Sequence, residues 1–526
     1  MRTIDLLDNG LARFPKRLCM LDAAPHSASG TALSFTHEEV RQFSHRIANG
    51  LRKAGLKRGS RVAIYSTNCA LALVCMVGLL RAGAVWLPVN TRNPLPENLE
   101  FLAENACEFV FCENALLQDL AAIRAATPTI RDAVLIGSSP ETSSYPHFFD
   151  WVQQFPDAFP DDHHGPEDLA WIKGTGGTTG RPKSVMLPHR AALALFATAQ
   201  ICMPMSHGQP HVSLVAAPIT HGAGNFALSL MSMGGTNVVV AKPDAATVLD
   251  AIERHRITTL MLPPTIIYNL LAYPGVRERD YSTLRYFVSG AAPISSDRLA
   301  EAIEVFGPVM AQLWGQTEAP MICSFMGPDD LARARDKPEL LKSCGRASPL
   351  TRIEVMDDGG QILPTGEIGE LVVRSDLVMK GYYERPAENE AASRFGWHHS
   401  GDVGYRDEEG YFYIVDRKKD MIISGGFNIY PSEIEQILWA HEAVLDCAVI
   451  GVPDPKWGEA VKAVVELKQG CTISEQELRD YCRERMGSTK TPRTFDIWDT
   501  LPRSSVGKVL KREIRDRFWT GQERRI

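Results

Sequence analysis

Short apolar runs alternate with longer segments of helical periodicity along the first part of the chain. Apolar residues recur at helical spacing over residues 36–53, and apolar runs at 61–65 and 84–88 flank an apolar segment at 69–82. Thr36 and Glu39 have the spacing of a capping box at the start of the first helix. The pattern predicts strand–helix–strand units, which are typical of a covered parallel sheet. The alternation continues, with predicted helices near 97–105 and 115–125 and predicted strands at 109–112 and 133–136.

Residues 138–166 interrupt this pattern, because they are rich in Ser, Pro, Asp and His. We interpret them as a loop, and we interpret His163 and His164 as solvated residues, since no third metal ligand lies nearby in the sequence. After the loop, the pattern predicts helices at 191–200, 244–255 and 295–305. The strands predicted between and around them are at 169–172, 212–217, 237–241, 259–262, 284–289 and 309–314.

The pattern changes again at about residue 351, where short alternating runs predict a β-rich subdomain. The charged run at 416–420 is typical of an exposed hinge, and the remainder has the size of a small α+β domain. We therefore expect an α/β fold whose large N-terminal domain, residues 1–416, contains doubly covered α/β sheets and a β-rich subdomain at about 351–416. A hinge at 417–419 and a small mobile α+β C-terminal domain at 420–526 complete the expected organisation.

Composition narrows the class of protein. A chain of 526 residues exceeds what one hydrophobic core supports, and 44% hydrophobic with 23% charged residues is ordinary for a soluble protein. The net charge of −7 argues against nucleic acid as a partner. Eleven cysteines without a Cys-x-x-Cys pair indicate reduced thiols. With no apolar signal core at the N-terminus, no targeting signal at the C-terminus and no run long enough to span a bilayer, we expect a cytoplasmic protein without an integral membrane segment.

The stretch at 173–183, Lys-Gly-Thr-Gly-Gly-Thr-Thr-Gly-Arg-Pro-Lys, carries the first candidate chemistry. Glycines let several backbone N–H groups converge on one anion, and the threonine hydroxyls and three cations add donors and positive charge. The stretch lacks the spacing of a Walker A loop. A flexible surface linker is the alternative, but linkers are usually Gly/Ser mixtures without interleaved cations. The stretch therefore predicts a binding loop for a triphosphate.

Further unusual loops follow later strands: 315–318 (Gly-Gln-Thr-Glu), 400–402 (Ser-Gly-Asp), 416–420 (Asp-Arg-Lys-Lys-Asp), 425–435 and 501–511. In this order and spacing they resemble the adenylate-forming superfamily, which comprises acyl-CoA synthetases, carrier-protein adenylation domains and luciferases. The resemblance covers nearly the whole chain. It implies an acid–CoA ligase that uses ATP, Mg²⁺ and coenzyme A: a carboxylate attacks the α-phosphate, pyrophosphate leaves, and a thiol then displaces AMP from the acyl-adenylate.

The resemblance also implies residue roles for the nucleotide. Thr317 contacts the α-phosphate as a catalytic residue, Glu318 binds Mg²⁺, and Asp402 accepts the ribose hydroxyls with Arg417 nearby. Adenine lies between Trp314 and the segment 291–293. The cofactor-binding residues implied are Thr175, Gly176, Gly177, Thr178, Thr179, Gly180, Lys183, Ala291, Ala292, Pro293, Trp314, Gly315, Gln316, Asp402 and Arg417. Gly176 and Ser184 depart from the serine and glycine that are common at these positions, but we expect ATP binding to be retained.

Lys508 resembles the family's catalytic lysine, and Lys419 falls where the family pivots. Rotation of the small domain is expected to withdraw Lys508 and to bring Gly425 and Gly426 to the acyl-adenylate. Trp457 resembles a residue that stacks on the adenine of CoA. Near it, Lys490 and Arg493 are candidate phosphate contacts, since the companions usual near 489 and 491 are absent.

His221 falls where the family gates or lines the carboxylate tunnel, and it completes the catalytic set. The other candidate pocket residues are mainly apolar and include no cation for a second substrate carboxylate: Phe226, Leu262, Pro264, Thr265, Ser289, Gly290, Leu313 and Ile322. A fatty, alicyclic or aromatic monoacid is therefore preferred over malonate. An adenylation enzyme that loads a carrier protein, a non-catalytic nucleotide-binding protein and a luciferase-like oxidase are the alternatives. A homodimer is left open.

Overall fold

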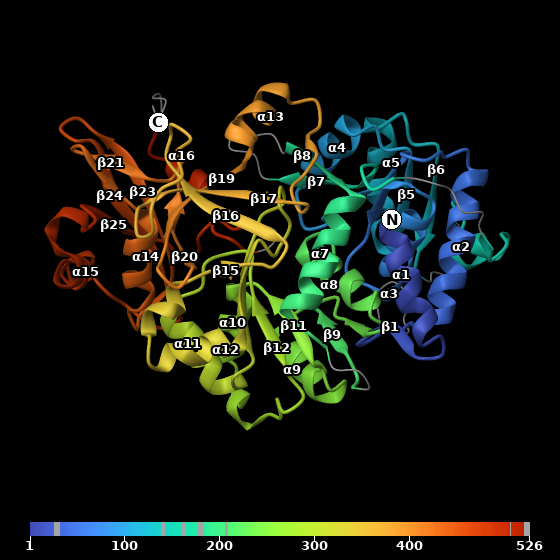
Figure 1. Ribbon diagram of the computed structural model, residues 1–526, viewed down its shortest axis with the longest axis horizontal. Coiled ribbons are helices and arrows are strands. Elements are labelled where there is room, and N and C mark those ends of the chain that lie inside the picture. The colour runs from blue at the N-terminus through green and yellow to red at the C-terminus, as the bar shows by residue number, and fades with distance from the viewer. Residues whose placement is uncertain are drawn as a thin grey trace.

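Three β-sheets organise the computed structural model, which describes residues 1–25, 32–137, 143–158, 165–175, 183–205, 209–504 and 507–519, without the side chain of residue 489. The first two sheets use the chain up to residue 417, and the third begins at residue 422. In Figure 1 the blue N-terminal elements and the red C-terminal elements lie at opposite sides of the molecule.

The largest sheet joins a parallel part to an antiparallel, β-rich part. Its parallel strands, in spatial order, are β13 (Met310–Trp314), β12 (Tyr286–Ser289), β11 (Thr259–Leu262), β9 (Val212–Val215), β10 (Thr236–Val239) and β1 (Leu18–Asp22). Antiparallel strands continue from β13 as β14 (Ser324–Met326), β15 (Gly345–Ala347), β20 (Tyr411–Arg417), β19 (His398–Arg406), β17 (Gly369–Ser375) and β16 (Thr351–Met356). The opposite edge is β2 (Ser34–Thr36).

The second sheet is parallel except at one edge, where the chain that carries the glycine-rich stretch turns back. Its strands, in spatial order, are β18 (Gly381–Tyr382), β8 (Lys183–Pro188), β7 (Leu169–Thr175), β4 (Val85–Val89), β3 (Arg61–Tyr65), β5 (Phe109–Glu113) and β6 (Asp132–Ile136). The pairs β18·β8 and β8·β7 are antiparallel.

Helices form layers between and outside these sheets. The helices between them are α1 (Thr3–Arg13), α2 (His37–Lys53), α3 (Ala70–Arg81), α7 (His189–Cys202) and α8 (Gly222–Met231), and one apolar core joins them to both sheets. Every residue of α3 is buried, as its uniformly apolar sequence predicts. The outer face of the first sheet carries α9 (Ala245–Arg254), α10 (Pro264–Leu271) and α11 (Ser296–Phe306), and the second sheet carries α4 (Leu95–Glu104) and α5 (Leu117–Ala126).

Short helices connect the larger elements: η1 (Asn114–Leu116), α6 (Phe148–Val152), η2 (Val276–Glu278), α12 (Pro328–Ala332), η3 (Arg333–Arg335), η4 (Pro338–Lys342), α13 (Pro386–Ala392) and η5 (Arg394–Gly396). The third sheet has the order β22 (Phe427–Ile429), β21 (Ile422–Ser424), β24 (Gly458–Leu467) and β23 (Val444–Asp454), and β25 (Thr494–Ile497) pairs parallel to β24. It has its own apolar core with α14 (Pro431–Trp439), α15 (Glu475–Lys490) and α16 (Lys511–Asp516) nearby.

Several predicted elements need correction. Residues 138–166 are not simply a loop, because α6 lies within them and buries Phe148 and Trp151. Helices α8 and α10 were not predicted from the periodicity, and neither was β1 near the N-terminus, which pairs with β10. The capping box is confirmed: Thr36 Oγ1 accepts from the Glu39 N–H at 3.2 Å, and Glu39 accepts from the Thr36 N–H at 2.7 Å. Among the described helices, none combines the length and apolar composition that crossing a bilayer requires.

Candidate active site

The glycine-rich stretch connects two paired strands of the second sheet. Thr175 ends β7 and Lys183 begins β8; the two residues are register partners, and the Thr175 hydroxyl donates to the Lys183 carbonyl at 3.4 Å. Gly176, Gly177, Thr178, Thr179 and Gly180 lie outside the described residues. The structure therefore defines the base of the predicted phosphate loop.

Glu318 faces this base through a tyrosine. The Tyr382 hydroxyl donates to Glu318 Oε1 at 2.9 Å, and the Lys183 ammonium lies 4.9 Å from the centroid of the Tyr382 ring. Burial, together with the Glu318 charge, raises the pKa of Tyr382, so the phenol stays protonated and remains a donor. Tyr382 was not predicted, because the two-residue strand β18 carries no motif.

Glu318 and Thr317 lie on a tight loop after β13. A side chain at Gly315 would place its Cβ 2.6 Å from the Met321 backbone, so only glycine fits there. The Gln316 N–H donates to the Ala319 carbonyl at 3.0 Å, and Met321 has φ 65°. The neighbouring parallel strand β12 leads to Ala291, which also has a left-handed φ of 72°. Strained backbone of this kind is concentrated at functional sites, and here it occurs next to both segments predicted to line adenine.

Asp402 lies at the centre of a buried group of polar side chains. Its carboxylate, in a residue only 3% exposed, accepts from the Trp314 indole N–H at 2.8 Å and pairs with Arg417 Nε at 2.5 Å. Asp402 and Arg417 are register partners in the β19–β20 hairpin, which explains their proximity. The structure thus brings together three residues predicted to contact the nucleoside, and Trp314 presents its N–H edge to the carboxylate.

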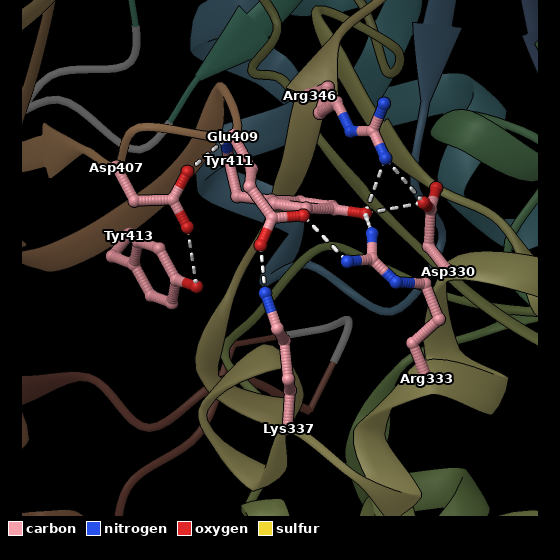
Figure 2. Close-up of polar contacts among 8 residues, drawn as sticks. All are labelled: Asp330, Arg333, Lys337, Arg346, Asp407, Glu409, Tyr411 and Tyr413. Atoms are coloured by element: carbon pink, nitrogen blue, oxygen red, sulfur yellow. Dashed lines mark hydrogen bonds and ion pairs between the residues drawn. The ribbon is translucent and has the colours of Figure 1, made fainter.

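The far end of the same hairpin is held by a polar network (Figure 2). The Tyr411 hydroxyl donates to Asp330 Oδ1 at 2.5 Å and accepts from Arg333 and Arg346 at 2.9 and 2.5 Å. Glu409 pairs with Arg333 at 2.6 Å and also with Lys337. Asp407 accepts from the Tyr411 N–H and from the Tyr413 hydroxyl. These contacts fasten the hairpin to α12, η3, β15 and Lys337, the residue before η4.

Lys508 lies on a turn next to the third sheet that approaches α10, a helix on the first sheet. The Ser504 N–H donates to the Lys508 carbonyl at 2.8 Å, and a Cβ on the neighbouring Gly507 would lie 2.8 Å from Thr265 Oγ1 in α10. Solvent reaches Lys508, and charged groups from both parts of the chain, Asp402 and Arg417 on one side and Asp420 and Lys511 on the other, act on its ammonium group. Desolvation, and then the charge of Arg417, lower the pKa of Lys508 to about 8 against the opposing effect of Asp402. Lys508 is therefore within electrostatic reach of the Asp402–Arg417 pair.

A buried ion pair anchors the Lys508 turn. Lys511, at the start of α16, donates to Glu435 at 2.8 Å, and the other Glu435 oxygen accepts from the Val449 N–H at 2.7 Å. Burial raises the pKa of Glu435 to about 7, although Lys511 opposes the rise. Next to this pair, Asp416 accepts from the Ser432 N–H at 2.8 Å, and Asp420 pairs with Arg515 at 3.2 Å. Both ends of the predicted hinge, which includes Lys419, are thus held by the third sheet's helices.

His221 is the N-cap residue of α8, and its ring Nδ1 lies 2.9 Å from Thr220 Oγ1. Although solvent reaches His221, desolvation by the surrounding protein atoms, and then the charge of Lys173, lower the pKa of its ring to about 4, so the ring is neutral near pH 7. A Cβ on Gly222 would lie 2.8 Å from Met261 and 3.6 Å from Met321. Gly222, the residue after His221, is thus close to two methionine side chains, and the role of His221 in the carboxylate tunnel stays a prediction.

Gly425 and Trp457 are in direct contact. Gly425 has φ 58°, and a Cβ there would lie 2.4 Å from Trp457 Cε3. The Arg493 guanidinium lies 5.2 Å from the Trp457 ring centroid, whereas Lys490 is paired with Glu433. Gly426 follows with φ 83°. The residues predicted for the CoA step therefore form a second group, on the third sheet.

Comparison with known proteins identifies the family. The model for AMP-binding enzymes matches residues 7–383, and the model for the AMP-binding enzyme C-terminal domain matches residues 433–508. A feruloyl-CoA synthase from Amycolatopsis sp. is 36% identical over 97% of this chain and 99% of its own. A long-chain-fatty-acid–CoA ligase from Bacillus subtilis is 32% identical over 94% and 93%. The solved structure of the amide bond synthetase McbA from Marinactinospora thermotolerans superposes with a TM-score of 0.87 at 28% identity, covering 98% of this chain and all of that one.

The chain belongs to the family of AMP-binding enzymes. It is an AMP-forming acid–thiol ligase, and the predicted family, α/β fold class, enzyme class and use of ATP, Mg²⁺ and CoA are confirmed.

Proposed function

We propose that the protein activates a fatty, alicyclic or aromatic monoacid as its acyl-adenylate and then transfers the acyl group to CoA, with the predicted residues in these roles. The observation that carries the proposal is the position of Lys508. Its turn contacts Thr265, and its ammonium group lies within reach of Asp402 and Arg417. This arrangement suits the adenylation step, in which negative charge grows on phosphate oxygens and a nearby cation lowers the barrier.

The polyphosphate and the metal fit the other end of the site. Glu318 is the carboxylate that would bind a metal ion here. The described contact of its side chain involves Oε1 alone. This fits Mg²⁺, which retains waters and is usually held by one or two carboxylates plus substrate phosphates. When bound, the ion would neutralise phosphate charge. Tyr382 would orient Glu318, and Thr175 and Lys183 would mark the base of the phosphate loop.

The acyl pocket supports the preference for a monoacid. Met261, Met321 and Leu313 approach Gly222 and Gly290 closely, and His221 is neutral. An apolar chain or ring is favoured by such a lining, because its burial contributes roughly 25 cal/mol per Å². The relatives named above act on ferulate and on long-chain fatty acids, in keeping with both ends of this range.

We further propose residues 417–419 as the hinge between a large domain at 1–416 and a small domain at 420–526. Rotation there would exchange Lys508 for Gly425, Gly426 and Trp457 at the acyl-adenylate. The cytoplasmic location stays a prediction, which fractionation would check. Light scattering of the purified protein would decide whether it forms a homodimer.

A two-part assay tests the proposed function. The purified enzyme is incubated with ATP, Mg²⁺ and a panel containing ferulate, a long-chain fatty acid, an alicyclic acid and malonate, with and without CoA. We expect acyl-CoA and AMP to form with one of the first three acids and not with malonate. Pyrophosphate exchange without thioester formation would favour a carrier protein as acceptor, and inactivity with every acid would favour a non-catalytic nucleotide-binding role.

A further inference from the structure

Lys173 is a buried cation next to the nucleotide-binding residues. It lies on β7, only 7% exposed, and its ammonium nitrogen is 3.0 Å from Asn225 Oδ1 on α8. The ring centroids of Trp86 and Trp171 lie 5.6 and 5.3 Å from the same nitrogen. An amide oxygen and two aromatic faces thus enclose a group that has three donors to satisfy.

No carboxylate compensates this charge within the part of the chain that the structure describes: the ion pairs found there do not include Lys173, and Asn225 is its hydrogen-bond partner. Burial alone lowers the pKa of Lys173 to about 7. The titratable group that faces it is His221, one helical turn before Asn225. Burying an ammonium group without an anion is costly, and such groups are concentrated at functional sites.

The strand register relates Lys173 to the base of the phosphate loop. Side chains two residues apart on a strand point to the same face and are roughly 7 Å apart, so Lys173 and Thr175 share a face of β7. Thr175 pairs with Lys183 at the point where the glycine-rich stretch begins and ends. On α8, Asn225 accepts from Lys173 one helical turn after His221, whose pKa the charge of Lys173 lowers. Lys173 thus links the strand that leads into the predicted phosphate loop to the helix that begins at His221.

We propose that Lys173 is a further cationic residue of the polyphosphate site, whose charge is neutralised by the β- and γ-phosphate oxygens of bound ATP or by pyrophosphate. This proposal rests on the proposed function for the location of the phosphates. Lys173 acts as a positioning and electrostatic residue: a nearby polyphosphate stabilises its ammonium form, and the departure of pyrophosphate removes that stabilisation.

A proton balance follows from this arrangement. At pH 8 a lysine with a pKa near 7 is about one-tenth protonated. If anion binding raises that pKa by one unit, the lysine becomes half protonated. Pyrophosphate binding should then take up roughly 0.4 proton at this residue. The affinity should weaken as the pH rises above the pKa of the free enzyme, because uptake becomes part of the binding equilibrium.

Calorimetric titration with pyrophosphate, at pH 8 in HEPES and in Tris, measures the proton uptake from the difference in buffer ionisation heat. The background is Lys508→Ala, which removes the other lysine that titrates near this pH. Two variants are compared with this background: Lys173→Met removes the charge, and Asn225→Asp has nearly the same volume and supplies a carboxylate partner to Lys173. AMP, which lacks the polyphosphate, is the control ligand, and thermal melting checks folding.

We expect the uptake to disappear in both variants. Pyrophosphate affinity should fall roughly twofold in Lys173→Met at pH 8 and roughly tenfold at pH 6, where the lysine of the background enzyme is largely protonated before binding, while AMP affinity stays unchanged. Uptake and pyrophosphate affinity that match the background in a folded Asn225→Asp variant would overturn the proposal, and so would an equal loss of AMP and pyrophosphate binding. If the unmutated enzyme binds neither pyrophosphate nor AMP, the proposed function itself is overturned.

Discussion

The contact between Gly507 and Thr265 joins the two parts of the chain in the orientation that places Lys508 near Asp402. Substituting Gly507→Ala should therefore slow adenylation while affecting the thioester step much less. The added Cβ would lie 2.8 Å from Thr265 Oγ1, closer than such atoms pack, and 3.7 Å from Thr265 Cβ, which is an ordinary contact. In an orientation with the small domain rotated away, the same methyl group would not meet Thr265.

Two energy terms set the size of the effect. Gly507 has φ 84°, and a left-handed alanine costs about 1–2 kcal/mol in any orientation. Overpacking against Thr265 adds about 1–3 kcal/mol in the observed orientation only. Since about 1.4 kcal/mol is a factor of ten, the second term predicts a selective loss of roughly 5- to 150-fold in adenylation.

The two half-reactions separate these terms. Adenylation is measured by pyrophosphate exchange without CoA, and thioester formation is measured from supplied acyl-AMP and CoA. Thr265→Ala in the Gly507→Ala background removes the hydroxyl and should restore most of the selective loss, with Thr265→Ala alone as the control for changes in the acyl pocket. Equal losses in both half-reactions, or no recovery in the double variant, would refute the reasoning.

Four further outcomes are expected. Lys508→Ala should lower pyrophosphate exchange by about 10²–10³-fold, the usual effect of removing one stabilising donor or cation, and should lower thioester formation from acyl-AMP far less; equal losses would contradict the two-orientation account. Because the pKa of Lys508 is about 8 and its ammonium form is the active one, the adenylation rate of the unmutated enzyme should fall as the pH rises through about 8, and Lys508→Arg should move that fall to higher pH; an unchanged alkaline limb would count against it. Tyr382→Phe removes the hydrogen bond that orients Glu318 and should raise the Mg²⁺ concentration needed for half-maximal exchange by roughly tenfold, which corresponds to the lower end of the free energy of a hydrogen bond to a charged group. The KM for the acid is the control and should stay constant. Tyr411→Phe should lower the free energy of unfolding by about 0.5–1.5 kcal/mol in urea, because it removes the hydrogen bonds of the hydroxyl while its charged partners remain accessible to water; an unchanged midpoint would show that the network contributes nothing there.

The sequence was most informative where an element depends on its own residues. The helix capped by Thr36 and Glu39 was predicted correctly because both partners of the cap lie within one turn. Helix α8 was missed because nine of its ten residues are buried, so no polar face marks the helical period. Helix α6 was missed because a single turn inside a polar segment gives no periodic signal, although its aromatic side chains pack in the core.

The site shows the same division between local and long-range information. Thr317, Glu318, Asp402 and Lys508 belong to short motifs, so the sequence alone was enough to predict them as site residues. Tyr382 joins Glu318 across 64 residues of sequence through a two-residue strand, and no local pattern predicts that contact. Lys173 was noted only as one charge of the glycine-rich stretch, and its burial against Asn225 depends on how α8 packs on β7.

The β19–β20 hairpin has one more consequence. It carries Asp402 and Arg417 at one end, is fastened by Tyr411 at the other, and leads directly into the proposed hinge. The proposed small domain is thus connected directly to the element that would bind the nucleoside, and the Tyr411 contacts fasten that element to the proposed large domain. An acyl-adenylate bound by this hairpin would stay in place while the small domain rotates between the two half-reactions. It would thus be protected from premature hydrolysis and from release into solution.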